Sequence, residues 1–311
     1  MARVVTVGGA QLGPIAREES RQSTVARLLE LMREAHGRGC DLVVYPELAL
    51  TSFFPRWWLG DEDEIDSWFE REMPGAATRP LFDEAARLGI GFYLGYAELA
   101  EEDGVTRRYN TSILVDKAGR MVGKYRKVHL PGHADHRPEL AFQHLEKRYF
   151  EVGDLGFRVW RTMGGVMGMC ICNDRRWPET YRVMALKGVE MVLLGYNTPA
   201  TLPWEPIYDN LSTFHNHLVM QAGAYQNSTW VVGIAKAGWE EGCDLIGGSA
   251  IIAPSGEIAA QCTTKDDELI AARCDLDLCA YNQKALFNFA EHRRVEHYGI
   301  ITAQTGAEPP E

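Results

Sequence analysis

The sequence predicts a single α/β domain built on a mixed β-sheet, and three observations lead to that prediction. Short apolar runs alternate with segments of helical periodicity along the 311 residues, as in an α/β fold. No linker rich in proline, glycine or serine divides the chain, so we expect one domain. Two strand-turn-strand patterns, at 115–123 and 252–259, predict antiparallel hairpins. The sheet is therefore expected to be mixed rather than wholly parallel.

Seven short runs predict the main strands. Several of them are almost wholly apolar, which is typical of strands buried on both faces. They lie at 4–8, 42–45, 91–96, 111–115, 166–172, 191–195 and 230–235. Helical patterns lie between them at 18–38, 78–88, 178–187 and 206–226. Gly89 and Gly188 are the expected ends of two of these helices, because glycine readily adopts the left-handed backbone that closes many helices.

Composition indicates a globular protein and disfavours two kinds of partner. With 46% hydrophobic and 24% charged residues, the chain has material for a large core. A net charge of −11 without a basic stripe argues against nucleic acid, and no apolar run approaches the ~20 residues that span a bilayer. The seven cysteines form no disulfide pattern, and the first residues read as a strand rather than a secretion signal. We therefore expect a cytoplasmic protein.

Three residues with reactive side chains lie at the ends of predicted strands. Glu47 comes just after a buried run and a proline, where a partly desolvated carboxylate can carry protons. Lys127 ends a basic strand, as a fixed cation for a developing oxyanion or as part of an exposed hairpin edge. Cys172 ends an apolar strand before a helix start, which predicts either a nucleophile with a lowered thiol pKa or a buried core cysteine.

Two further groups of residues suggest ligands. Arg175 and Arg176 could grip a carboxylate by paired charge-assisted hydrogen bonds, or could pair with local carboxylates or lie on the surface. The histidines at 129, 133, 136 and 144 lack the spacing of a zinc-binding helix and are interrupted by prolines. We therefore expect no metal and no other cofactor. Cys170 shares a strand face with Cys172, but is poorly spaced for an unstrained disulfide and is expected in the core.

In this order and context the motifs resemble the nitrilase superfamily of carbon-nitrogen hydrolases. The motifs are Tyr45-Pro-Glu47, Gly123-Lys-Tyr-Arg-Lys127-Val-His129-Leu and Cys172-Asn-Asp-Arg-Arg-Trp-Pro-Glu179, and the resemblance runs from residue 4 to about 274. It implies an α-β-β-α sandwich, in which two mixed sheets pack face to face between layers of helices. It also implies a hydrolase domain at 1–280, a C-terminal arm at 281–311 that packs on a neighbouring subunit, and a homo-oligomer of two or four chains.

The resemblance also assigns roles to residues. Cys172 is the implied nucleophile and Glu47 the base, while Lys127 and the backbone amide of Asn173 hold the oxyanion. Glu146 matches a position that supports Lys127, although by itself it could equally form a surface ion pair. The implied substrate contacts are His129, His144, Asn173, Arg175, Arg176, Asn197 and Thr198.

Within the superfamily, four segments resemble the N-carbamoyl-D-amino acid amidohydrolases. They lie at 53–57, 129–133, 142–150 and 195–199, whereas 1–30, 60–72 and 199–210 carry no helpful motif. This resemblance implies that a small N-carbamoyl-D-amino acid is hydrolysed to the D-amino acid, ammonia and carbon dioxide. Two alternatives stay open. One is a β-ureidopropionase-like enzyme or other amidase with the same triad, and the other is a catalytically silent binding protein.

Overall fold

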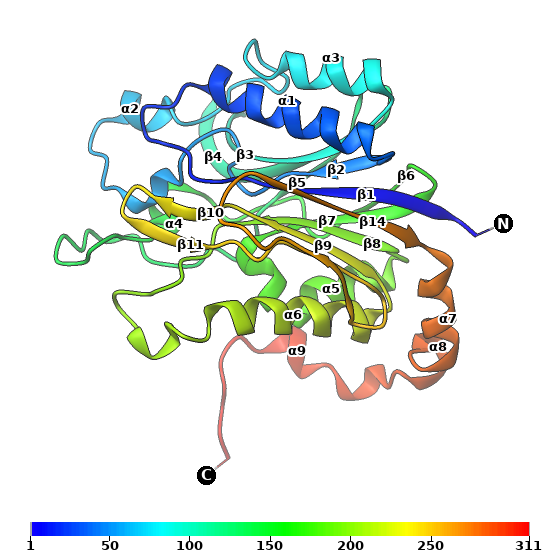
Figure 1. Ribbon diagram of the computed structural model, residues 1–311. Coiled ribbons are helices and arrows are strands. Elements are labelled where there is room, and N and C mark those ends of the chain that lie inside the picture. The colour runs from blue at the N-terminus through cyan, green and yellow to red at the C-terminus, as the bar shows by residue number, and fades with distance from the viewer. Residues whose placement is uncertain (1, 311) are drawn as a thin grey trace.

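The chain forms two six-stranded sheets that pack face to face between two layers of helices (Figure 1). The computed structural model describes residues 2–310. One sheet has the strand order β14-β1-β2-β3-β4-β5 and the other β13-β12-β9-β8-β7-β6, each with parallel and antiparallel neighbours. The α-β-β-α sandwich of two mixed sheets is therefore confirmed.

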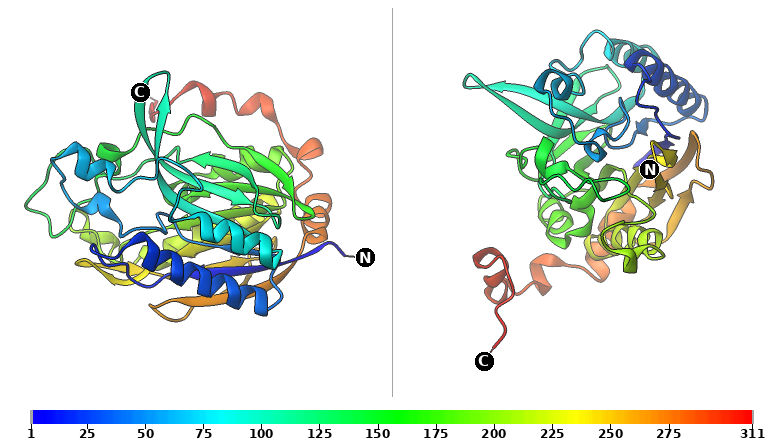
Figure 2. Two further views of the ribbon diagram at one scale, coloured as in Figure 1. Left: turned by 90° about the horizontal axis from the view of Figure 1, so that it is seen from above. Right: turned by 90° about the vertical axis from the view of Figure 1, so that its left-hand side faces the viewer.

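The first sheet carries helices on its outer face (Figure 2). Its strands are β1 (Val4–Gln11), β2 (Leu42–Val44), β3 (Gly91–Glu102), β4 (Val105–Val115), β5 (Met121–Arg126) and β14 (Glu268–Asp275). Helices α1 (Arg21–Gly37) and α3 (Arg79–Leu88) cover them, while η1 (Phe54–Arg56) and α2 (Glu62–Asp66) lie in the long connection between β2 and α3.

The second sheet is covered by two helices on the opposite side of the molecule. Its strands are β6 (Val159–Thr162), β7 (Gly165–Ile171), β8 (Met191–Tyr196), β9 (Trp230–Ala235), β12 (Ala250–Ile252) and β13 (Ile258–Gln261), and its helices are α5 (Pro178–Leu186) and α6 (Ser212–Asn227). A separate ribbon pairs β10 (Ala237–Glu240) with β11 (Cys243–Ile246). The remaining short helices are α4 (Glu146–Tyr149), η2 (Cys172–Arg176), η3 (Pro206–Tyr208), α7 (Asp277–Ala285), α8 (Phe289–His292), η4 (Val295–His297) and α9 (Ile300–Ala303).

The core between the sheets explains why the strand sequences are so apolar. The inner faces contribute Val7 and Val44 from the first sheet and Leu193 and Ile234 from the second, all fully buried. Each such side chain stabilises the fold by about 1.5–3 kcal/mol relative to exposure. A polar bridge also crosses this core, because the Tyr93 hydroxyl donates to the Cys170 carbonyl and accepts from the Gly195 amide, both at 3.1 Å. The two sheets are thereby fixed relative to each other near the ends of β7 and β8.

The seven expected strands, both hairpins and the two glycine helix ends are confirmed. The helix expected at 206–226 is wrong at its start, since only η3 and an irregular loop precede α6. The Asp209 carboxylate accepts a hydrogen bond from the Leu202 backbone amide at 2.9 Å, and such a local side-chain bond favours a loop over a continuous helix. Strands β6, β10, β11 and β14 had no sequence prediction. Within residues 2–310, no helix is both long and apolar enough to cross a membrane.

Candidate active site

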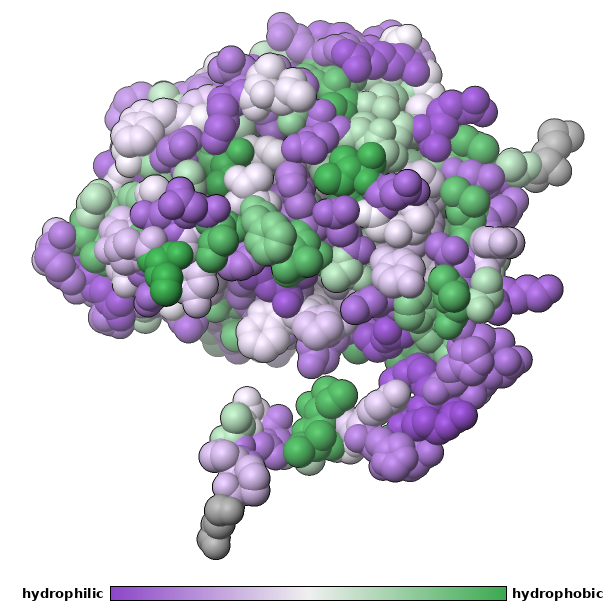
Figure 3. All heavy atoms as spheres, turned by 60° about the horizontal axis from the view of Figure 1, so that its bottom comes forward, coloured by the Kyte–Doolittle hydropathy of each residue, from purple (hydrophilic) through white to green (hydrophobic). Residues whose placement is uncertain are grey.

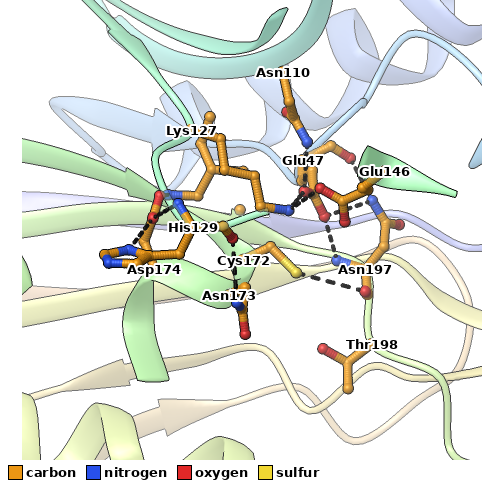
Figure 4. A network of polar contacts seen from close by, with 12 residues as sticks. Glu47, Asn110, Lys127, His129, Glu146, Cys172, Asn173, Asp174, Asn197 and Thr198 are labelled. Atoms are coloured by element: carbon orange, nitrogen blue, oxygen red, sulfur yellow. Dashed lines mark hydrogen bonds and ion pairs between the residues drawn. The ribbon is translucent and has the colours of Figure 1, made fainter. Parts of the chain in front are cut away.

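Four of the expected catalytic residues converge at one end of the sandwich (Figure 4). Glu47 follows β2, Lys127 follows β5, Cys172 follows β7, and Glu146 begins α4. The Lys127 Nζ lies 2.8 Å from Glu47 Oε1 and also contacts Glu146 Oε2. All four residues are at most 5% exposed. Strand ends from both sheets, together with the start of α4, thus bring together a thiol, an ammonium and two carboxylates.

Two glycines allow the backbone at Glu47 to lie between the sheets. A Cβ at Gly195 would lie 2.2 Å from the Glu47 nitrogen, and one at Gly95 would lie 2.8 Å from the Glu47 Cα. Neither distance is sterically possible, so glycine is required for this close approach. The Glu47 carboxylate then accepts hydrogen bonds from Asn110 Nδ2 at 2.8 Å and from the backbone amide of Asn197 at 2.9 Å. The carboxylate is held from three sides once Lys127 is included.

Cys172 is held in an unusual backbone conformation. Its φ of 46° lies in the left-handed region, which costs a residue with a Cβ about 1–2 kcal/mol. The expected lowering of the thiol pKa is wrong: burial raises the pKa of Cys172 to about 11, and the Glu47 carboxylate adds to the rise. Lys127 and Arg175 act in the opposite direction but do not compensate. The resting nucleophile is therefore a neutral thiol beside a potential base.

Lys127 is charged despite its burial. Burial alone would lower the pKa of Lys127, but Cys172 and the carboxylates of Glu146 and Glu47 raise it overall. Burial would likewise raise the pKa of Glu146, but Lys127 and His144 lower it. His144 Nε2 lies 2.9 Å from Glu146 Oε1, so Glu146 bridges the histidine and the lysine. This arrangement keeps a fixed positive charge beside Cys172.

A cavity of about 430 Å³ opens onto Cys172. This volume suits a small-molecule ligand. The walls are aromatic, aliphatic and polar: Pro131, Gly132, His144, Cys172, Asn173, Arg176, Asn197, Thr198, Pro199, Leu202, Trp204, Tyr208, Ser212 and His215. Much of one wall comes from 199–210, a segment in which sequence reasoning found no helpful motif. No aspartate or glutamate is among these lining residues, so Arg176 meets no carboxylate in the wall.

The two adjacent arginines lie on different sides of η2. Arg176 lines the cavity and is exposed to solvent there, while the protein packed around its guanidinium and the charge of Arg175 lower the pKa of Arg176 to about 10. Arg175 is not part of the cavity wall and is 1% exposed. Its guanidinium donates to the Cys172 carbonyl, to Thr198 and to Asn216. The structure therefore brings only Arg176 of the expected pair to the cavity.

His129 also lies apart from the cavity wall. Its ring stacks on Trp177 at 4.8 Å, and its Nδ1 lies 2.8 Å from Asp174 Oδ1. Asp174, which sequence reasoning missed, is fully buried and also accepts from Tyr125 and from the Ile171 amide. His144, Asn173, Asn197 and Thr198 do line the cavity, as expected. Within the described chain, no three histidine, cysteine or acidic side chains cluster as metal ligands.

This two-sheet fold, with a buried thiol, ammonium and carboxylate together at one end, is the arrangement that the sequence resemblance implies for a carbon-nitrogen hydrolase. The carbon-nitrogen hydrolase family model matches residues 5–281. The chain therefore belongs to the carbon-nitrogen hydrolase family, as the sequence resemblance implies.

Relatives of this chain carry several different names. It is 30% identical over 296 residues to a nitrilase of Pyrococcus abyssi, covering 95% of this chain and 99% of the relative. It is 29% identical to an N-carbamoylputrescine amidase of Arabidopsis thaliana, covering 98% and 97%. It is 34% identical over 209 residues to a citrullinase of Francisella tularensis, covering 66% and 68%. These names share carbon-nitrogen chemistry but not one substrate, and they do not support the finer resemblance to D-amino acid amidohydrolases.

Solved structures show the same fold. A carbon-nitrogen hydrolase from Helicobacter pylori G27 superposes with a TM-score of 0.81 at 22% identity, covering 96% of this chain and 98% of that one. An amidase mutant from Nesterenkonia sp. AN1, which has a covalent acetamide addition at its active-site cysteine, gives 0.73 at 19% identity and covers 95% of each chain. At these identities the likeness is one of fold.

Proposed function

We propose that this enzyme hydrolyses N-carbamoyl-D-amino acids to the D-amino acid, ammonia and carbon dioxide. The observation that carries the proposal is Arg176, a guanidinium in the wall of a cavity that has no lining carboxylate. Arg176 is exposed to solvent at this wall, so it is accessible to a substrate carboxylate, which it can bind by paired charge-assisted hydrogen bonds. The D configuration is supported by the four sequence segments that resemble D-amino acid amidohydrolases.

In the proposed reaction the ureido carbon of the substrate is the electrophile. Cys172 attacks it while Glu47 takes the thiol proton, which is still on sulfur at neutral pH. Lys127 and the Asn173 amide hold the oxyanion of the tetrahedral intermediate. Glu47 then gives its proton to the departing nitrogen, and a thiocarbamate is left on Cys172. Water activated by Glu47 clears this intermediate, and the resulting carbamic acid loses carbon dioxide.

Charge distinguishes this substrate from those of two alternatives. An N-carbamoylated diamine keeps a free ammonium, which Arg176 would repel and for which the cavity wall offers no carboxylate. A simple neutral amide leaves Arg176 unpaired. A β-ureido acid does carry a carboxylate, but its lack of a side chain leaves Leu202 and Trp204 without a contact. The cavity therefore favours an α-amino acid derivative with an apolar side chain over a β-ureido acid.

The test is ammonia release from four substrates. We expect N-carbamoyl-D-phenylalanine to give the highest kcat/KM, above its L form, β-ureidopropionate and N-carbamoylputrescine. The Cys172→Ala protein is the control for contaminating activity. Faster turnover of N-carbamoylputrescine would contradict the charge argument, and faster turnover of the L form would overturn the stereochemical assignment alone.

We further propose that the enzyme is a cytoplasmic homo-oligomer that associates through its α6 face. Phe214, Leu218 and Tyr225 of α6 are 59%, 48% and 43% exposed, and Figure 3 shows apolar side chains among charged ones on this side. An exposed apolar face of this kind suits self-association. All seven cysteines are free thiols, which fits the cytoplasm. Sedimentation velocity should show a dimer or tetramer that Leu218→Glu dissociates, and a monomeric wild type would contradict this.

A further inference from the structure

Arg175 occupies a position behind the nucleophile rather than beside the cavity. Its Nη1 donates to the Cys172 carbonyl at 2.7 Å, its Nη2 to Thr198 Oγ1 at 2.9 Å, and its Nε to Asn216 Oδ1 at 3.0 Å. The guanidinium also lies 4.3 Å from the Tyr196 ring centroid. All three guanidinium nitrogens are thus engaged, Nη1 also lies 3.8 Å from Cys172 Sγ, and none of these partners is a carboxylate. The side chain joins the Cys172 turn to the end of β8 and to α6.

The carbonyl that Arg175 holds belongs to the same peptide unit as the Asn173 amide. A trans peptide is planar, so its C=O and N–H point in opposite directions. With the oxygen fixed toward Arg175, the Asn173 N–H points away from it. A hydrogen bond from a cation to the carbonyl also polarises the peptide, which makes its N–H a stronger donor. Arg175 therefore acts on both the direction and the strength of this donor.

We propose that Arg175 is a positioning residue that orients and polarises the Asn173 amide for the oxyanion, and that it does not bind the substrate carboxylate. The proposal rests on the proposed covalent mechanism, in which that amide is an oxyanion donor. Cys172 has a left-handed backbone, and the hydrogen bond from Arg175 to the Cys172 carbonyl helps to hold it in that conformation. A strained turn persists only where its surroundings hold it in place.

Adjacent arginines provide a matched test. The variants are Arg175→Gln, Arg175→Lys and, as the control, Arg176→Gln. Each is assayed for ammonia release from N-carbamoyl-D-phenylalanine and from 2-phenylethylurea, which lacks the carboxylate. Thermal unfolding and circular dichroism check the fold of each variant. Arg175→Lys keeps the buried charge and one donor, so it serves if the glutamine variant does not fold.

The two arginines are expected to affect different kinetic constants. Arg175→Gln should lower kcat by about 10- to 100-fold on both substrates, because a weakened oxyanion donor acts on the transition state alone, and KM should stay within about twofold. Arg175→Lys should lose less. Arg176→Gln should raise KM about 10-fold or more for the carboxylate substrate only.

Three outcomes would contradict either the positioning role of Arg175 or the proposed substrate. If Arg175→Gln and Arg175→Lys raise KM for the carboxylate substrate alone, Arg175 is a carboxylate ligand and the inference is overturned. Unchanged kcat in a folded Arg175 variant also overturns it. If Arg176→Gln changes KM equally for both substrates while the Arg175 variants still lower kcat, the proposed N-carbamoyl amino acid substrate is wrong and the positioning role of Arg175 stands.

Discussion

Cys172 is expected to react as a thiol rather than a thiolate at neutral pH. Burial and the Glu47 carboxylate raise the pKa of Cys172 to about 11, against an ordinary value of 9.0. At pH 8 a thiol with a pKa near 11 is about 0.1% ionised, whereas one with a pKa near 9 is about 9% ionised. The reactive fraction of Cys172 is therefore about 90-fold smaller than that of an unperturbed cysteine.

A small neutral alkylating agent without a carbonyl group measures this fraction. Iodoethanol suits the purpose, because it offers no oxygen to the oxyanion site and so does not imitate the substrate. The rate constant for loss of activity should rise about tenfold per pH unit between pH 7 and pH 10, without a plateau. Intact mass should show one alkyl group per chain, and Cys172→Ala should show none. A rate that levels off below pH 8 would refute the view that Glu47 must remove the thiol proton during attack.

Three further predictions concern the charges and the cavity. Lys127→Met leaves two carboxylates buried without their cation, so it should cost about 3–5 kcal/mol in urea unfolding and at least about 100-fold in kcat, and near-wild-type values would contradict the buried-pair geometry. Arg87 and Arg33 lower the pKa of Glu84 to about 2, so Glu84 stabilises the fold above its unfolded pKa near 4.5, and this is lost as pH falls toward 2. Glu84→Gln should therefore lose less unfolding free energy than wild type between pH 5 and pH 3, and equal losses would contradict this. Trp204→Ala should raise KM about 10-fold for N-carbamoyl-D-phenylalanine but leave N-carbamoylglycine within about twofold, and equal effects would remove Trp204 from the side-chain pocket.

The sequence alone pointed to the residues that meet at the candidate active site because each one has a recognisable local context. Glu47 and Cys172 follow buried strands that short apolar runs reveal, and Lys127 follows the second strand of a hairpin that its turn reveals. Asn110, which donates to Glu47, has no such context: it lies inside β4, 63 residues away in sequence. Its role depends on how the strands pair, which local patterns do not determine.

Other site properties depend on burial and direction rather than residue type. Arg175 and Arg176 have the same side chain at adjacent positions. Within η2, however, Arg175 points into the protein and Arg176 lines the cavity. The helix start after Cys172 suggested a lowered thiol pKa, but burial and Glu47 outweigh the nearby cations. The 199–210 segment has no motif because its contribution to the wall is shape and aromatic surface.

The most direct test of the central claim is to trap the intermediate on Cys172. Wild-type enzyme mixed with N-carbamoyl-D-phenylalanine should be quenched in acid within the first turnovers and its Cys172 peptide examined by mass spectrometry. The mechanism predicts a thiocarbamate on that peptide, with a mass that also shows whether ammonia or the amino acid leaves first. Turnover with no adduct, or turnover that persists in Cys172→Ala, would contradict the account.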